Sequence, residues 1–319
     1  MQEFFDRPDP VPGRCEVLIQ VDVAGVNPLD HLLRSGLVDG LDGGRPFPRV
    51  LGMEAAGTVL ARGEDVIGLE VGDAVFGFAL TGGGTYAETT VLSAPNTARI
   101  PAGLSTTVAA TLPVAGTTAV DVLDQLSLTP GATILVNGVG GGVGLAVARL
   151  AVARELRVIG TGSTAKREHA EAIGVRFVDY TAENVTAAAR AMVPDGFDGI
   201  VDLAGGSSLR SVAPLAQDPR NVISVGDISV SDLGGRFVER RTDRESLERS
   251  ARLALDGLLA PVITAVHPLS GAPAALATVE NGHTAGKVVI KVRETCRPSD
   301  AVDRRLRTAA FARDRQLIS

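Results

Sequence analysis

The chain lacks tryptophan altogether and has only two cysteines among its 319 residues. Cys15 and Cys296 are too few and too distant for a zinc cluster or a disulfide framework, which favours a reducing, cytoplasmic location. Uninterrupted apolar runs are also short: none reaches the ~18 residues of a membrane span, and no charged segment with an apolar core opens the chain. The sequence therefore predicts neither a disulfide-stapled secreted domain nor a membrane partner.

Positive charge is scarce as well, because 31 lysines and arginines stand against 37 aspartates and glutamates, a formal net charge of −6. Proteins that bind nucleic acid usually present a basic face, and no basic cluster precedes the C-terminal tail of this chain. Nucleic acid is therefore not an expected partner. The length exceeds the usual size of a single hydrophobic core, so we expect two lobes.

The most informative segment that is present lies at 134–145, where an apolar, strand-like run leads into five glycines and then into a helix-like pattern. Only glycine lets the backbone turn this tightly and approach a pyrophosphate, while the N-terminus of the following helix offers unpaired N–H groups. The spacing of Gly138, Gly141 and Gly144 differs from the commonest pattern, G-x-G-x-x-G. The order of strand, glycines and helix nevertheless predicts a dinucleotide site, with a plain glycine-rich turn as the alternative.

The end of the next predicted strand indicates which dinucleotide binds. NAD-binding sites place an acidic residue there, about 20 residues past the glycines, but this chain has Ser163, Lys166 and Arg167. A hydroxyl and two cations suit the 2′-phosphate of NADPH through charge-assisted hydrogen bonds. These residues favour NADPH over NADH, the alternative being that Lys166 and Arg167 are ordinary solvated residues at the start of a helix.

The patterns along the chain predict an α/β protein. Short β-like runs punctuated by glycine, from Glu16 to about Ile100, are typical of a small, bent antiparallel barrel. From 134 to 225 strand and helix patterns alternate, which specifies a doubly wound parallel sheet with helices on both faces. We expect a catalytic segment at 1–108, a dinucleotide-binding segment at 109–245, a return to the catalytic domain at 246–292, and a tail at 293–319 that is mobile, docked on a partner or helical.

Eight different short motifs follow one another in a characteristic order, at 25–30, 51–57, 71–77, 84–88, 113–119, 138–144, 178–180 and 286–289. Each is weak alone, but together they extend from about Pro8 to Val292, and on them the chain resembles the medium-chain dehydrogenase/reductase superfamily, specifically its zinc-free quinone oxidoreductase branch. The resemblance implies a GroES-like β-barrel catalytic domain with an inserted Rossmann domain, a cofactor in the cleft between them, and a homodimer.

The resemblance also implies that no metal is used. Zinc alcohol dehydrogenases of this superfamily have a thiolate ligand where Asn27 stands and an imidazole where Met53 stands, because the metal polarises the alcohol oxygen. Neither ligand is present, and the four histidines share no metal-ligand spacing with one another or with a cysteine. These histidines are His31, His169, His267 and His283.

Without a metal, the hydride acceptor must stabilise its own developing charge, as a quinone or an α,β-unsaturated carbonyl does. Hydride arriving at the β-carbon leaves negative charge on the carbonyl oxygen, and the protein then has to position the partners and supply hydrogen-bond donors. We expect a metal-independent NADPH:quinone or enone oxidoreductase. Two alternatives are a tailoring reductase or dehydratase-like enzyme of secondary metabolism, and a non-catalytic, nucleotide-binding regulatory protein.

By the same resemblance, Asn27 lies near the nicotinamide and is the catalytic candidate, since its amide is able to donate toward the acceptor oxygen; a plain turn cap before Pro28 is its alternative role. Thr118 is expected to contact the carboxamide from the opposite lobe. The remaining cofactor contacts implied are Gly141, Gly142, Val143 and Gly144 at the pyrophosphate, Ser163 and Lys166 at the 2′-phosphate, Tyr180 near the adenine, Gly205 and Gly226 at the sheet edge, and Lys287 in the closing motif.

No general acid stands out in the sequence, and protonation by water is expected. Asp30 and Glu54 resemble an acid/base pair but are interpreted as structural hydrogen-bonding residues, and Tyr86 is as easily a packing residue as a substrate contact. The family usually has one more strand ahead of the segment equivalent to Asp9 and Pro10. Either the barrel lacks that edge strand, which would widen the mouth of the active site, or the start of the sequence is trimmed.

Overall fold

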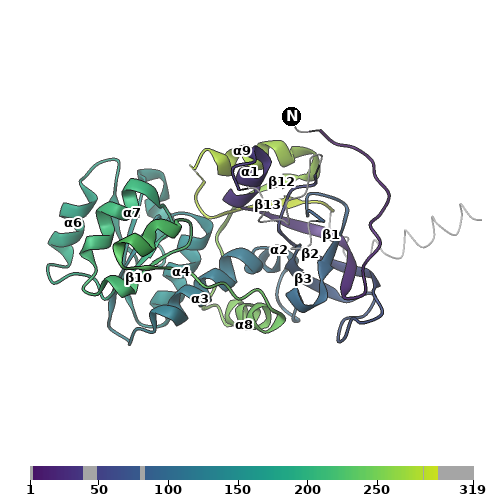
Figure 1. Ribbon diagram of the computed structural model, residues 1–319, viewed down its shortest axis with the longest axis horizontal. Helices are drawn as coiled ribbons and strands as arrows, with labels where there is room; N and C mark the ends of the chain where they lie inside the picture. The colour runs from purple at the N-terminus through teal and green to yellow at the C-terminus, as the bar shows by residue number, and fades with distance from the viewer. Residues whose placement is uncertain (1–2, 39–48, 80–82, 283, 294–319) are drawn as a thin grey trace, which may run out of the picture.

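The structure is a computed structural model that describes residues 3–38, 49–79, 83–282 and 284–293. His283, Cys296 and nearly all of the expected tail lie outside the described residues. The described part forms two lobes side by side along the long axis, each built around its own sheet (Figure 1). Among the helices of this part, none is long and apolar enough to cross a membrane.

The first lobe is a bent sheet in which β1 (Glu16–Val26) is the central strand. Its order is β12-β13-β1-β2-β3-β5, with β4 pairing β1 as well, and all pairs except β12 with β13 are antiparallel. Two irregularities in the β1–β2 register bend the sheet toward a barrel. The other strands are β2 (Glu54–Arg62), β3 (Ala74–Phe78), β4 (Thr89–Ser93), β5 (Thr97–Arg99), β12 (Ile263–Pro268) and β13 (Lys287–Lys291).

The second lobe is a parallel sheet with the order β11-β10-β9-β6-β7-β8. Its central strand β6 (Thr133–Asn137) is buried along its whole length, as expected for a strand covered by helices on both faces. From β6 the successive strands are added toward one edge of the sheet, and from β9 they are added toward the other edge. The boundary between β6 and β9 is therefore the topological switch point, where such folds bind ligands. The other strands are β7 (Arg157–Gly162), β8 (Arg176–Asp179), β9 (Gly199–Asp202), β10 (Val222–Ser224) and β11 (Arg236–Phe237).

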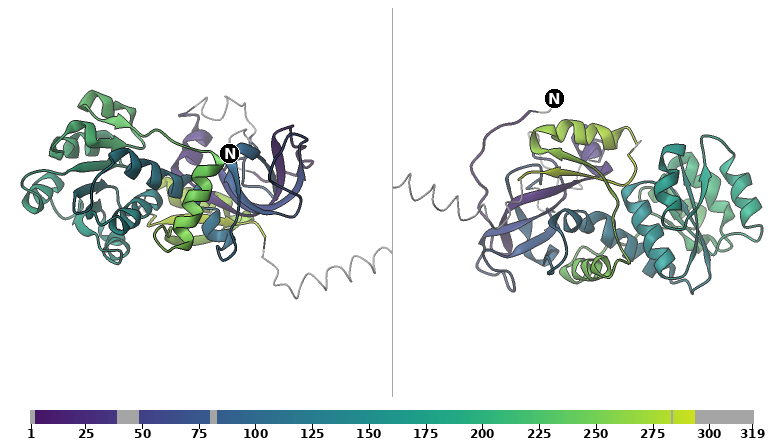
Figure 2. Two further views of the ribbon diagram at one scale, coloured as in Figure 1. Left: turned by 90° about the horizontal axis from the view of Figure 1, so that it is seen from below. Right: turned by 180° about the vertical axis from the view of Figure 1, so that it is seen from behind.

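The α-helices are α1 (Pro28–Ser35), α2 (Thr106–Ala109), α3 (Thr117–Leu126), α4 (Gly142–Ala153), α5 (Arg167–Glu171), α6 (Val185–Met192), α7 (Gly206–Val212), α8 (Arg244–Leu255) and α9 (Ala272–Glu280), and η2 (Leu112–Gly116) is a π-helical turn. The 3₁₀ turns are η1 (Ala94–Asn96), η3 (Thr164–Lys166), η4 (Ala213–Leu215), η5 (Pro219–Asn221), η6 (Ile228–Leu233) and η7 (Leu269–Gly271). Viewed from below, α8 lies across the junction of the lobes (Figure 2). The predicted fold class, a doubly wound parallel sheet joined to a β-barrel-like domain, is confirmed.

Candidate active site

The glycine segment forms the turn between β6 and α4. Gly138 has φ of +90°, a conformation that residues with a side chain rarely adopt. At Gly144 a Cβ atom would lie 2.5 Å from the carbonyl oxygens of Gly138 and Val139, so only glycine lets the helix approach the turn this closely. No side chain caps the N-terminus of α4, which begins at Gly142 after the N-cap Gly141. Its first N–H groups are therefore available to an anion such as a pyrophosphate.

The glycine segment is also tied to the strand that returns to the first lobe. The N–H of Gly286 donates to the carbonyl oxygen of Gly140 at 2.9 Å, and Gly286 pairs with Gly141 in a short parallel bridge. The side chain of Lys287 runs directly beneath the helix start, because a Cβ on Gly142 would lie 2.5 Å from Lys287 Cδ. The predicted pyrophosphate contacts and the closing motif are thus adjacent in space.

Asn27, the catalytic candidate, is buried at the N-cap of α1 and lies in a network with Lys287 and Glu54. Lys287 Nζ donates to Asn27 Oδ1 at 2.7 Å and to Glu54 Oε1 at 2.6 Å. Asn27 Nδ2 in turn donates to Glu54 Oε1 at 2.8 Å. Because an ammonium group can only donate, it fixes the oxygen of the Asn27 amide on its own side, and one Nδ2 hydrogen is left for a further acceptor. In this structure Lys287 orients Asn27, a role that the sequence motif did not indicate.

The second oxygen of Glu54 joins this network to the other lobe. Glu54 Oε2 accepts a hydrogen bond from the backbone N–H of Val114, at 2.8 Å, in the π-helical turn η2. Thr118, the other nicotinamide candidate, donates its hydroxyl to the carbonyl oxygen of the same Val114. π-Helical turns often occur at functional sites. The buried carboxylate of Glu54 therefore contacts both Asn27 and the turn η2, whose Val114 accepts the hydrogen bond from Thr118.

Asp30 and Tyr86 lie behind Asn27. Asp30 Oδ2 accepts from the backbone N–H of Asn27 at 2.7 Å and from the Tyr86 hydroxyl at 2.8 Å. Burial raises the pKa of Asp30 to about 7, against the opposing effect of these two hydrogen bonds, and the nearby Glu54 carboxylate raises it further. Burial and the Asp30 carboxylate also raise the pKa of Tyr86 well above its usual value. The partial exposure of Tyr86 and its hydrogen bond to Asp30 show that it is more than a packing residue.

The expected 2′-phosphate end contains a cation, Lys166, that has no acidic partner among the described residues. Ser163 precedes the turn η3 at the end of β7, and Lys166 closes that turn. Lys166 Nζ donates to the carbonyl oxygen of Gly282 at 2.9 Å, and its side chain runs close over Gly140. Within the described ranges Lys166 pairs with no carboxylate, and partial burial lowers its pKa. Tyr180, at the end of β8, is 56% exposed and open to a stacking partner.

Arg167, the second cation that the sequence offered, is engaged elsewhere. Its guanidinium pairs with Glu171 at 3.0 Å and with Asp179 at 4.0 Å. It also lies over the ring of Phe177, 4.8 Å from the centroid. The structure therefore distinguishes the two neighbouring cations, and Lys166 is the one with charge to spare for a phosphate.

A polar cluster that sequence reasoning missed crosses the sheet at the carboxyl ends of its strands. Asn137 Nδ2 donates to Asp202 Oδ1 at 2.7 Å, and Asp202 Oδ2 accepts from the Ser224 hydroxyl at 2.7 Å. Asp202 also accepts from the N–H of Gly205, while Gly226, after β10, has open space beside its Cα. A sequence signal for this cluster was present, since Asn137, Asp202 and Ser224 are the polar last residues of three otherwise mainly apolar strands.

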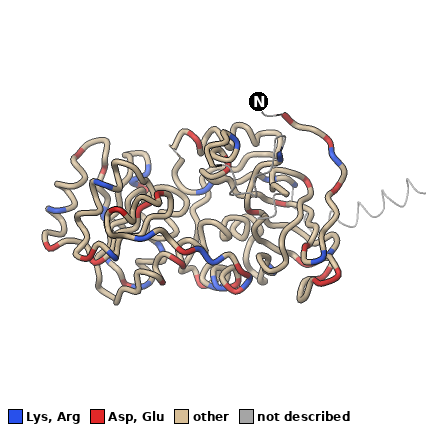
Figure 3. The backbone as a smooth tube through the Cα atoms, in the orientation of Figure 1, with Lys and Arg blue, Asp and Glu red and all other residues tan. Residues whose placement is uncertain are grey.

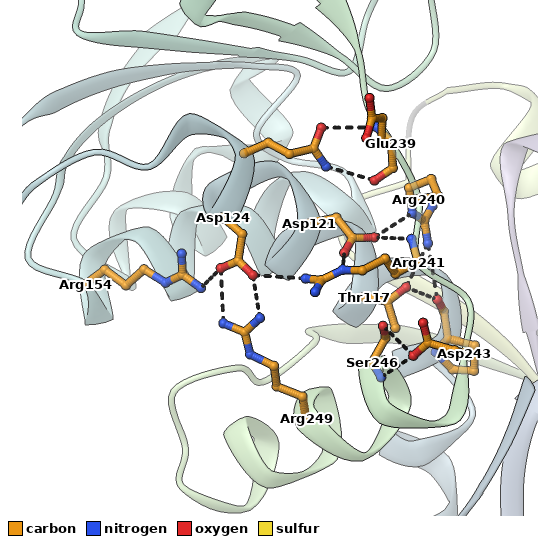
Figure 4. A network of polar contacts seen from close by, with 12 residues as sticks. Thr117, Asp121, Asp124, Arg154, Glu239, Arg240, Arg241, Asp243, Ser246 and Arg249 are labelled. Carbon is orange, nitrogen blue, oxygen red and sulfur yellow. Dashed lines mark hydrogen bonds and ion pairs between the residues drawn. The ribbon is translucent and has the colours of Figure 1, made fainter.

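Beneath the site, an Asp/Arg network fastens the segment after β11 to the helix that carries Thr118 (Figure 4). Asp121 of α3 is 1% exposed on its side chain and pairs with Arg240 at 3.4 Å and Arg241 at 3.0 Å. Asp124, one turn on, contacts Arg241 at 3.0 Å and Arg249 of α8. Charged stretches of both signs meet in this region, between the lobes (Figure 3). The network holds the return segment against α3.

The residues gathered at the carboxyl ends of the parallel strands fit a dinucleotide. The helix start is uncapped, Lys166 has charge available, and the space next to Gly226 is open. By contrast, the described residues include no group of three or more His, Cys, Asp or Glu side chains that could hold a metal ion. An amide and a thioether, from Asn27 and Met53, are also poor substitutes for the thiolate and imidazole that zinc prefers.

Comparisons with known proteins agree with this architecture. Residues 13–102 match the alcohol dehydrogenase GroES-like domain, and residues 173–290 match the zinc-binding dehydrogenase family. A 2-methylene-furan-3-one reductase from Solanum lycopersicum is 34% identical over 287 residues, which cover 86% of this chain and 71% of the reductase. An NADPH-dependent alkenal/one oxidoreductase of the Arabidopsis thaliana chloroplast is 32% identical, with 86% of this chain and 72% of that protein covered.

Among solved structures, the quinone oxidoreductase from Coxiella burnetii superposes with a TM-score of 0.83 at 28% identity, covering 91% of this chain and 95% of that one. Some relatives are considerably longer. The chain spans 43% of the length of a synaptic vesicle membrane protein VAT-1 homolog from Danio rerio, to which it is 35% identical over 215 residues.

Proposed function

Because the chain belongs to the medium-chain dehydrogenase/reductase superfamily, as a relative of its quinone and alkenal/one oxidoreductases, we propose that it reduces a quinone or an α,β-unsaturated carbonyl with NADPH. The observation that carries the proposal is the oriented amide of Asn27. Lys287 and Glu54 occupy its oxygen and one of its hydrogens, which leaves a single N–H positioned to donate. A preorganised donor of this kind stabilises the charge that develops on a carbonyl oxygen.

NADPH, when bound, supplies the hydride. Different parts of the chain contact different parts of NADPH. The N-terminus of α4 binds the pyrophosphate, Lys166 and Ser163 bind the 2′-phosphate, and Thr118 and Asn27 lie at the nicotinamide end. The free Nδ2 hydrogen of Asn27 binds the substrate oxygen, where negative charge collects after reduction at the β-carbon. The buried Lys287 keeps that hydrogen from rotating away.

Metal independence is part of the proposal and rests on the chemistry of the side chains. The buried carboxylate that contacts the side-chain amide of Asn27 belongs to Glu54, and its oxygens already accept from Lys287, Asn27 and Val114. An additional cation at this point would have to displace the Lys287 ammonium. We expect purified protein to contain no stoichiometric zinc and to keep its activity in the presence of a chelator.

The test is a titration with NADPH and NADH followed by a screen of 1,4-quinones and alkenals, monitored by loss of nicotinamide absorbance. We expect NADPH oxidation with at least one acceptor class, and an Asn27→Ala variant that still binds NADPH through its other contacts but turns over ~100-fold or more slowly. Failure to bind either dinucleotide at millimolar concentration contradicts the proposal. Turnover that requires added zinc contradicts its metal-free part.

We also infer a cytoplasmic homodimer in which the parallel sheet, the dinucleotide-binding unit at 109–245, continues across the interface. Strand β11 is an outer strand of this sheet, and Phe237 on it and Ile228 nearby are 42% and 76% exposed. A two-fold axis beside such an edge buries the same surface on both copies. Light scattering on the purified protein measures the mass, and a Phe237→Asp variant is expected to be monomeric.

A further inference from the structure

We propose that Asp30 is a positioning residue that holds Asn27 in place through its main chain, and that the charge on Asp30 sets how strongly the Asn27 site stabilises a reduced acceptor. The inference rests on the proposed function and deepens it, because it names a group that regulates the donor amide. It starts from the way in which the main chain enters α1.

Asn27 is fixed at its main chain as well as at its side chain. It lies between the end of β1 and Pro28, the first residue of α1. The N–H of Asn27 donates to Asp30 Oδ2 at 2.7 Å, and the N–H of Asp30 donates to the carbonyl oxygen of Asn27 at 3.0 Å. Pro28 has no N–H to contribute to this turn. The two reciprocal bonds therefore fix the point from which the Asn27 amide extends.

Asp30 is in turn fixed by a residue from outside the helix. The Tyr86 hydroxyl donates to the same Oδ2 at 2.8 Å. The main-chain N–H of Tyr86 donates to the carbonyl oxygen of Leu51 at 2.9 Å, in the segment that leads into β2. Tyr86 is thus anchored at both ends, and Asp30 cannot turn away from Asn27 without losing both hydrogen bonds to Oδ2.

The two oxygens of Asp30 have very different surroundings. Oδ2 accepts from Asn27 and Tyr86, whereas Oδ1 is buried and has no hydrogen-bond partner among the residues that the structure describes. An ionised carboxylate with an unsatisfied, buried oxygen is unfavourable, and a proton on that oxygen removes the charge. Asp30 therefore holds Asn27 through Oδ2 as a neutral acid, with its proton on Oδ1.

Ionisation of Asp30 changes the charge of the whole buried cluster. Burial has the largest effect on its pKa and, together with Glu54 of β2, raises it to about 7, against the hydrogen bonds from Asn27 and Tyr86 and the charge of Lys287 on β13. While Asp30 is neutral, the charges of Glu54 and Lys287 cancel. Once Asp30 is ionised, the cluster carries one net negative charge, which opposes the negative charge that develops on the acceptor oxygen beside Asn27.

The other charged side chains next to α1 are engaged elsewhere. Arg34, in the last turn of α1, pairs at 2.7 Å with Glu280 of α9, the helix that packs against α1. Arg49 donates to a main-chain carbonyl oxygen of α1. His31, the next residue along the chain, is not among the groups that shift the pKa of Asp30. A pH dependence that disappears when Asp30 is replaced is therefore due to Asp30 itself.

The test is the pH profile of hydride transfer in a single turnover, followed by the loss of NADPH absorbance with an acceptor that has no ionisable group. We expect the wild-type rate constant to fall ~10-fold as pH rises through about 7. Asp30→Asn keeps an oxygen for the Asn27 N–H and the Tyr86 hydroxyl but cannot ionise, so it is expected to show the low-pH rate of the wild type throughout. Asp30→Ala has no such oxygen and is expected to be ~10-fold slower at every pH.

Tyr86→Phe distinguishes this account from a merely structural role. The Tyr86 hydroxyl lowers the pKa of Asp30, so its loss is expected to move the fall in rate to higher pH. Thr89→Val is the matched control, because the Thr89 hydroxyl donates to Asp9, and its profile is expected to equal that of the wild type. A fall in rate that persists in Asp30→Asn, or a Tyr86→Phe profile that coincides with the wild type, overturns the inference.

A second readout needs no turnover. The main-chain amide resonance of Asn27, whose proton is donated to Asp30, is expected to shift with the same midpoint in the wild type and to stay constant in Asp30→Asn. A wild-type resonance that does not move with pH overturns the inference, whatever the acceptor. Absence of NADPH oxidation by the wild type with every acceptor overturns the proposed function instead, so the two failures are distinguishable.

Discussion

The Nζ atom of Lys166 lies 2.9 Å from the carbonyl oxygen of Gly282, so the predicted 2′-phosphate ligand bridges to the segment just ahead of β13. This contact joins the parallel sheet to the part of the chain that returns to the barrel. A neutral carbonyl oxygen is a weaker partner for an ammonium group than a phosphate dianion. We therefore expect NADPH, but not NADH, to draw Lys166 from Gly282 to the 2′-phosphate when it binds.

We predict that Lys166→Gln weakens NADPH binding ~10–100-fold, the usual effect of losing one charge-assisted hydrogen bond. NADH affinity is expected to change less than about threefold, because no phosphate is lost from its contacts. Isothermal titration with both cofactors measures the two dissociation constants. Arg167→Gln is the control, since its guanidinium is engaged by Glu171 and Phe177. Equal losses for both cofactors in the Lys166 variant would remove the 2′-phosphate assignment.

We predict that Glu54→Gln destabilises the protein by about 3–5 kcal/mol, because it leaves the Lys287 ammonium buried without a counter-charge. The double variant Glu54→Gln with Lys287→Met is expected to recover most of that stability, since no buried charge remains. Urea unfolding of the three proteins measures the difference. In addition, both variants are expected to lose kcat, because Asn27 is no longer oriented. A double variant as unstable as the single one is the result that contradicts this account.

The pKa of Asp30 predicts how stability changes with pH. The folded protein holds this proton up to a pH of about 7, whereas the unfolded chain releases it near the ordinary value of 3.8. Between these limits the folded state binds one more proton, so the contribution of Asp30 to stability falls as pH rises, by on the order of 4 kcal/mol in total. Asp30→Asn is expected to lack this slope. The measurement is the unfolding free energy of both proteins from pH 4 to pH 8, and parallel curves argue against the raised pKa.

We predict that Asp121→Ala costs about 3–5 kcal/mol, because it leaves the largely buried Arg240 without its carboxylate. The same substitution at Asp218, whose pair with Arg220 is exposed, is expected to leave the unfolding midpoint unchanged within error. Thermal unfolding of the two variants compares a buried and an exposed ion pair in one protein. A similar change in both would mean that the network in Figure 4 does not hold the return segment.

The features predicted most successfully from the sequence are those that depend on residues close together in the chain. The turn after β6 needs glycine at Gly138 and Gly144 for backbone reasons alone, and the alternation that follows specifies the parallel sheet. NADPH, the cofactor named for a relative of this chain, was predicted from Ser163, Lys166 and Arg167, which lie within five consecutive residues, and their contact with the 2′-phosphate stays a prediction. In each case a few neighbouring residues contain the whole physical argument.

The parts that could not be predicted depend on contacts between distant segments. Glu54 and Val114 are 60 residues apart in the chain, and Lys287 and Asn27 are 260 apart. Nothing in the sequence around these residues shows that the Glu54 carboxylate accepts hydrogen bonds from both Val114 and Lys287. Likewise, the difference between Lys166 and Arg167 comes from Phe177 and Asp179 on the neighbouring strand. The three-dimensional fold determines how deeply these side chains are buried and which residues they contact. The order of motifs predicted the class of the fold but not these contacts.

The pairing of β13 with β1 also governs how the protein is made. The barrel cannot complete its central sheet until residues 288–291 have left the ribosome, whereas the parallel sheet consists of one continuous stretch of chain. The second lobe can fold before the first has its last strands, while residues 23–26 of β1 remain without their β13 partner and open to other nascent chains. Nascent chains truncated ahead of β13 should therefore be the form that chaperones retain.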